Sequence, residues 1–158
     1  MASDQKNLSD YSDKNITNMA SKKVAVVVSE WNEEVTESLY QGALDTLLQH
    51  GVKKENIIRK NVPGSFELTL AAQWMAAENN IDAVICLGCV IQGETRHFDF
   101  ICDAVANGIT NVAIKYNKPV IFGVLTTQNQ KQALDRSGGK HGNKGDEAAI
   151  TAVKMLGF

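Results

Sequence analysis

Runs of apolar residues alternate along this chain with segments in which apolar residues recur every three or four positions. The first run, from Val24 to Val28, predicts a strand that is buried on both faces. The segment after it predicts an amphipathic helix ending near His50-Gly51, with four apolar residues on one side: Val35, Leu39, Ala43 and Leu47. A strand is thus followed by a helix.

The same alternation recurs three more times. Apolar runs predict three further strands, at Asn56 to Val62, Ala83 to Cys89 and Val120 to Leu125. Helical spacing follows each of them: from Ser65 to Asn79, after a loop at Gly93, and from a capping box at Thr127 to Gln130 as far as Arg136. A last helix is expected from about Asp146 to Leu156.

Four strand-helix units with apolar strands predict an α/β fold, a parallel sheet with helices on both faces. In such sheets ligands bind outside the carboxyl ends of the strands. Four loops follow those ends and are expected to converge on one pocket: Trp31-Asn32, Gly64 to Glu67, Val90 to His97, and Thr126-Thr127. These loops hold the candidate chemistry.

Length and composition place this fold in one globular domain. The chain has 158 residues, of which 44% are hydrophobic and 22% charged, as in ordinary globular proteins. Residues 1–21 are polar and are expected to form a flexible arm, which leaves residues 22–158 as the domain. The net charge of -2 gives no reason to expect nucleic acid or a membrane as a partner. With no long apolar run and a polar N-terminus, a cytoplasmic location is expected.

The segment Gly93-Glu94-Thr95-Arg96-His97 is the strongest local feature. Free amides at a helix start suit a phosphate group, and glycine allows a ligand to approach the backbone closely. His97 would lie near that anion and could exchange protons with a reacting group. The same pattern is also typical of a plain helix cap with a surface histidine.

Two large aromatic residues, Trp31 and Phe66, follow neighbouring strands and could cover a flat heteroaromatic ring. Asn32 and Glu67 beside them could bind hydroxyl groups. The alternative is that both rings are core residues at the edge of the sheet.

Two other motifs indicate a functional site less strongly. Cys86 and Cys89 form a C-x-x-C, but residues three apart on a strand point to opposite faces, which disfavours a metal site. The stretch from Gly138 to Gly145 evokes a nucleotide-binding loop, yet Asn143 and Gly145 stand where that motif requires glycine and a hydroxyl residue. Lys140, Lys144 and Arg136 still supply charge for an acidic ligand, unless the stretch is a solvated turn.

Taken together, five motifs resemble the 6,7-dimethyl-8-ribityllumazine synthase family from about Lys22 to the C-terminus. They occur in the right order: Ser29 to Asn32, Pro63 to Glu67, Gly93 to Asp99, Phe122 to Thr127, and Gly142 to Gly145. The resemblance implies a flavodoxin-like three-layer α/β/α sandwich with a four-stranded parallel sheet. It also implies condensation of 5-amino-6-(D-ribitylamino)uracil with 3,4-dihydroxy-2-butanone 4-phosphate, without cofactor or metal.

The resemblance also implies roles for individual residues. Trp31, where the family often has phenylalanine, would stack on the pyrimidine, and the rest of that pocket would comprise Asn32, Ser65, Phe66, Glu67, Val90 and Ile91. Gly93, Glu94, Thr95 and Arg136 would hold the phosphate, and His97 would shuttle protons. Phe122, Arg136 and Lys144 would come from a neighbouring subunit of a pentamer.

The compact turn from Gly139 to Gly145 resembles that of family members that assemble as sixty-subunit icosahedral capsids. Riboflavin synthase is a candidate partner of such an assembly. Three other functions stay open from the residues alone: a flavin-binding or storage module of flavodoxin-like fold, a signalling receiver domain, and a cage that is only a container.

Overall fold

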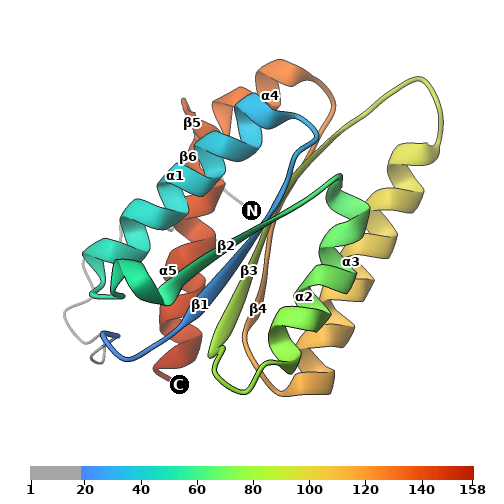
Figure 1. Cartoon of the computed structure of the whole chain (residues 1–158). Coiled ribbons are helices and arrows are strands. Elements are labelled where there is room, and N and C mark those ends of the chain that lie inside the picture. Colours follow the sequence, from blue (N-terminus) through green and yellow to red (C-terminus); the bar gives the residue numbers. More distant parts are fainter. Residues whose placement is uncertain (1–18) are drawn as a thin grey trace.

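A computed structural model describes residues 19–158, and its centre is a four-stranded parallel sheet (Figure 1). The strands lie in the order β2-β1-β3-β4, with bounds β1 (Val24–Ser29), β2 (Ile57–Val62), β3 (Ala83–Ile91) and β4 (Val120–Thr127). All four predicted strands are present, and β3 and β4 each run two residues beyond the predicted end. β1 pairs with β2 and β3 and is buried along its whole length, as its apolar run predicted.

Two pairs of helices cover the sheet and complete a three-layer sandwich (Figure 1). α1 (Glu33–Gln49) packs with α5 (Lys144–Leu156) on one face, and α2 (Leu68–Ala77) packs with α3 (His97–Tyr116) on the other. Alternate β1 residues enter the two cores: Val24, Val26 and Val28 face the α1 and α5 side, and Ala25 and Val27 face the α2 and α3 side. The predicted fold class is confirmed.

Local conformations set the helix ends near the carboxyl edge of the sheet. Asn32 adopts a left-handed conformation with φ 62° and turns the chain from β1 into α1. The helix predicted from Ser65 starts as a short 3-10 turn, η3 (Ser65–Glu67), and continues as α2. Another such turn, η2 (Lys54–Asn56), precedes β2.

The predicted capping box at Thr127 to Gln130 is wrong. Thr127 is the last residue of β4, and α4 (Gln130–Asp135) is capped by Asn129. The Asn129 side chain accepts from the Gln132 amide at 2.9 Å, and the Gln132 side chain accepts from the Gln128 amide at 2.9 Å. The cap therefore starts two residues later, because strand pairing with β3 extends through Thr127.

The stretch after α4 is an ordered hairpin in place of an irregular loop. β5 (Ser137–Gly139) pairs antiparallel with β6 (Gly142–Asn143) beside α1, and Gly138 and Gly142 have φ values of 110° and 78°. Asn143 donates to the Ser38 carbonyl at 2.9 Å and accepts from the Gly145 amide at 2.8 Å. This cap starts α5 two residues before the predicted Asp146.

Most of the expected arm, residues 1–18, lies outside the described residues. Met19 is only 1% exposed and belongs to the core on the α1 and α5 side, so packing starts before Lys22. Over residues 19–158, no helix is long and apolar enough to cross a membrane.

Candidate active site

A cavity of about 740 Å³ lies at the carboxyl ends of β1, β2 and β3, beside the start of α3. It is lined by eight of the site residues predicted from the sequence: Trp31, Asn32, Ser65, Phe66, Glu67, Val90, Ile91 and His97. Cys89, Phe100 and Ile101 also line it and were not predicted. We refer to this space as the first cavity.

Hydrogen bonds fix the two polar residues at the rim of the first cavity. Asn32 donates from Nδ2 to the Cys89 carbonyl at 2.9 Å, which ties the end of β1 to β3. Glu67 accepts at Oε2 from the Gly64 amide at 3.0 Å, so its carboxylate holds the turn that contains it. Asn32 keeps its amide oxygen, and Glu67 keeps the other carboxylate oxygen, as polar atoms for a ligand.

The two aromatic residues predicted for the first cavity are too exposed to be core. The Trp31 side chain is 73% exposed and Phe66 is 56% exposed. Exposed rings of this size around a cavity mark a surface that binds a ligand or another subunit. The alternative of sheet-edge core residues is therefore not what this structure shows.

Ser65 provides a buried polar atom in the same cavity. Its Oγ is buried and has no hydrogen-bond partner among residues 19–158. The Ser29 Oγ is likewise buried and without a partner among these residues. Both hydroxyls face Gly88, where an added Cβ would stand 2.6 Å from the Ser65 Oγ and 3.4 Å from the Ser29 Oγ. A buried hydroxyl without a partner is costly, which suits a group that meets a ligand or a water molecule.

The segment Gly93 to His97 is exposed and ends in the first residue of α3. Arg96 at the N-cap makes no side-chain cap, but the His97 amide donates to the Thr95 Oγ1 at 3.4 Å. The amides of Gly93, Glu94 and Thr95, just before the helix, make no hydrogen bond with residues 19–158 and remain available to an anion. A Cβ added at Gly93 would meet no atom of the described part of the chain within 4 Å, so the glycine leaves open space beside the backbone. The His97 ring lines the first cavity and makes no hydrogen bond with residues 19–158.

The other predicted residues lie in a second cavity of about 720 Å³, on the β4 side of the molecule. Phe122, Arg136 and Lys144 line it, together with Thr126 and Thr127. The expectation that all four carboxyl-end loops share one pocket of this chain is thus wrong for Thr126-Thr127. β4 is the edge strand beyond β3, and its end faces α4 and the β5–β6 hairpin.

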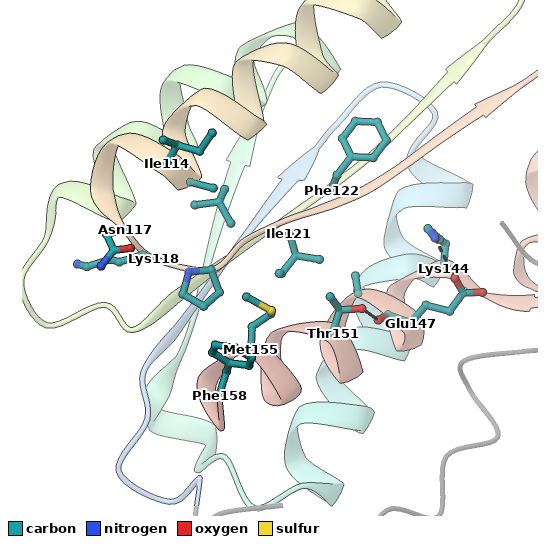
Figure 2. Close-up of a pocket in the computed structure, with 14 residues that line it drawn as sticks. Ile114, Asn117, Lys118, Ile121, Phe122, Lys144, Glu147, Thr151, Met155 and Phe158 are labelled. Atoms are coloured by element: carbon teal, nitrogen blue, oxygen red, sulfur yellow. Dashed lines mark hydrogen bonds and ion pairs between the residues drawn. The ribbon is translucent and has the colours of Figure 1, made fainter.

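Glu147 is a site residue that the sequence analysis missed. Its side chain is 7% exposed and accepts an ion-paired hydrogen bond from the Lys144 Nζ at 2.8 Å, one turn earlier on α5 (Figure 2). A buried carboxylate needs such a partner, and it fixes the lysine in return. The three-residue spacing on a helix was the available signal.

An apolar groove of about 760 Å³ adjoins this ion pair between the end of α3, β4 and α5 (Figure 2). Ile114 is 75% exposed and Met155 is 50% exposed along it. Trp74 on α2 and Phe100 in the first turn of α3 are also exposed, by 59% and 67%. Large apolar side chains from α3 and α5, Ile114 and Met155, are thus exposed on both sides of the edge strand.

Cys86 and Cys89 do not form a functional site. Cys86 packs in the core beside α2 and α3, and Cys89 packs in the opposite core, as the strand spacing predicted. Burial raises the pKa of the Cys86 thiol to about 12 and that of Cys89 to about 11, so neither is a ready nucleophile. Residues 19–158 contain no group of three or more histidine, cysteine or acidic residues that could hold a metal.

Comparisons with known proteins agree with the motifs over nearly the whole chain. The family model for 6,7-dimethyl-8-ribityllumazine synthase matches residues 21–158. A relative of that name from Cytophaga hutchinsonii is 69% identical over 99% of this chain and 98% of its own length. Another from Parabacteroides distasonis is 51% identical over 100% of this chain and 99% of its own length. The chain belongs to the 6,7-dimethyl-8-ribityllumazine synthase family.

Proposed function

We propose that this enzyme condenses 5-amino-6-(D-ribitylamino)uracil with 3,4-dihydroxy-2-butanone 4-phosphate to give 6,7-dimethyl-8-ribityllumazine, phosphate and water. It would thereby act as a transferase in the penultimate step of riboflavin biosynthesis. The observation that carries the proposal is the first cavity, which combines exposed aromatic rings, polar atoms at its rim and a histidine beside free helix amides.

The pyrimidine substrate would occupy the first cavity. Trp31 would stack on its ring, since exposed indole offers a wide aromatic face. Asn32, Ser65 and Glu67 would bind the ribityl hydroxyls, and the Ser65 hydroxyl would gain the partner that it lacks. Phe66, Val90 and Ile91 would form the apolar wall.

The phosphate substrate would bind at the start of α3. Amides from Gly93, Glu94 and Thr95 would donate to the phosphate oxygens, and the helix dipole would add to their effect. The Arg136 guanidinium would add two parallel charge-assisted hydrogen bonds.

His97 would move the protons that the condensation requires. Attack of the amine on the ketone carbon forms a C–N bond, and loss of water from that adduct needs a proton on the leaving oxygen. Elimination of phosphate then needs a base that removes a proton from carbon, and attack of the ribityl-bearing nitrogen on the second carbonyl carbon closes the ring with loss of a second water. Orientation of two small substrates can lower such a barrier by roughly 7–11 kcal/mol, so the histidine need only assist.

The complete site would be shared by two subunits. Arg136, Phe122 and Lys144 line a different cavity from His97 in the same chain, which suits their approach to the first cavity of a neighbour. Glu147 would hold Lys144 in place for that contact. Exposed apolar residues on both sides of the edge strand support a homo-oligomer.

We further propose a pentamer in a cytoplasmic sixty-subunit capsid, with riboflavin synthase as a candidate partner. The hairpin between Ser137 and Asn143 is compact and bonded to α1, without the longer insertion expected of pentamers that stay separate. Light scattering of the purified protein tests this. A mass of five subunits would contradict the capsid, and it would leave the proposed reaction unaffected.

The reaction itself is tested by mixing the purified protein with both substrates. Lumazine absorbance and inorganic phosphate should appear together in equal amounts. Tight binding of a flavin with no lumazine formed would instead support the storage module.

A further inference from the structure

Gln92, which connects β3 to the segment Gly93 to His97, has a polar side chain to which neither the motifs nor the proposed mechanism assigns a role. Its backbone amide donates to the Thr127 carbonyl at 2.8 Å, which anchors the residue to the end of β4. Its side chain is exposed and lines neither of the two cavities. Any effect of this side chain on a ligand therefore has to pass through the residues that it contacts.

The Gln92 side chain spans the loop that precedes α3. Its Nε2 donates to the Gly93 carbonyl at 2.9 Å and makes a longer hydrogen bond of 3.5 Å to the Thr95 carbonyl. Within residues 19–158, no other side chain donates to these two carbonyls. One amide group thus holds both ends of a three-residue loop.

Peptide geometry converts these two bonds into a direction for the loop amides. In a planar trans peptide, the N–H group points opposite to the C=O group of the preceding residue. The Glu94 and Arg96 amides therefore point away from Gln92, and neither is hydrogen-bonded within residues 19–158. Glycine lets the peptide plane after Gly93 turn over more readily than other residues would, so the bond to Gln92 fixes an otherwise free choice.

We propose that Gln92 is a positioning residue for the phosphate substrate, which holds the amides of Glu94 and Arg96 toward the phosphate and the loop carbonyls away from it. This inference rests on the proposed function, because the loop meets a phosphate only in that account. A carbonyl oxygen turned toward a phosphate would repel it, and a loop that becomes ordered only on binding costs affinity. Loss of the two side-chain bonds should thus weaken phosphate binding and leave binding of the pyrimidine unchanged.

The variant Gln92→Met tests this role, because methionine has a similar length and removes the donor without adding a charge. The KM for the phosphate substrate should rise about three- to tenfold, as expected for one lost hydrogen bond. The KM for the pyrimidine substrate should stay unchanged. Calorimetry with inorganic phosphate, on the assembled full-length proteins, should show the same loss of affinity. Urea unfolding should match that of the unmodified protein, since the side chain is exposed.

Gln41→Met is the matched control. Gln41 is exposed on α1, donates from Nε2 to the Asp45 carboxylate at 2.9 Å and lines neither cavity, so this change should alter neither KM. Unchanged phosphate affinity in Gln92→Met, or an equal rise of both KM values, would overturn the inference. Absence of lumazine formation by the unmodified enzyme would instead overturn the proposed function.

Discussion

The His97 ring lies at the entrance of the first cavity and has no bonded partner within residues 19–158. An exposed side chain that makes no hydrogen bond with the described residues can be removed at little cost to folding. We predict that His97→Ala lowers kcat by up to about 100-fold, the lower end of general acid-base effects. Steady-state lumazine formation measures the loss.

A matched control for this variant is His50→Ala. His50 follows α1 and contacts the Thr46 carbonyl at 2.7 Å, away from both cavities. It should lower thermal stability slightly and leave kcat unchanged. Normal turnover in a well-folded His97→Ala protein would remove His97 from the mechanism.

At the scale of elements, substitutions at two glycines test the packing of the fold and the binding of the ligand independently. A Cβ at Gly88 would stand 2.9 Å from the Leu68 Cδ1 and 2.6 Å from the Ser65 Oγ, so Gly88→Ala must displace η3 from β3. We expect a loss of about 1–3 kcal/mol of stability, measured by urea unfolding.

Gly93→Ala should behave in the opposite way. Its Cβ would meet no atom of residues 19–158 within 4 Å, so unfolding should be unchanged, but the methyl group would crowd a phosphate at the helix start. We predict a higher KM for the phosphate substrate alone. An unchanged KM would mean that the phosphate does not approach this backbone.

The contact between α1 and α5 contains an unfavourable charge. Burial, followed by the charges of Asp45 and Glu147, raises the pKa of Asp146 above its ordinary value. The folded protein thus binds this proton more tightly than the unfolded chain, so ionisation costs stability above that pKa and the cost disappears as the pH falls.

Asp146→Asn should therefore raise the Tm at pH 7, by a gain below about 1 kcal/mol, and the gain should shrink towards pH 4. Glu55→Gln, at an exposed position in η2, is the control and should change little at either pH. A lower Tm at pH 7 would show that the charge favours the helix start more than burial disfavours it.

Element type followed from the sequence, whereas element ends depended on local bonding. Apolar runs such as Val24 to Val28 can only be buried, so the strands and their faces were predictable. The cap at Asn129 was missed because Thr127 stays paired within the sheet. The start of α5 was missed because it depends on the bond from Asn143 to Ser38, 105 residues earlier.

At the scale of the whole molecule, the motifs identified the candidate site residues, but they did not show which of these residues line the same cavity. His97 lies after β3 and Arg136 lies after α4, and the structure puts them in different cavities. The burial of Glu147 also depends on packing between distant segments. Spacing along a chain carries no information on which residues would meet only across a subunit boundary.

In the proposed active site, His97 of one subunit acts together with Arg136 of a neighbouring subunit. The test mixes His97→Ala and Arg136→Ala proteins, dissociates and reassembles them, and compares lumazine formation with each variant reassembled alone. Random assembly in a ring should restore about a quarter of the sites, because a neighbouring pair is then intact by chance. Activity no higher than the mean of the two variants, in mixed assemblies verified by mass, would contradict a shared site.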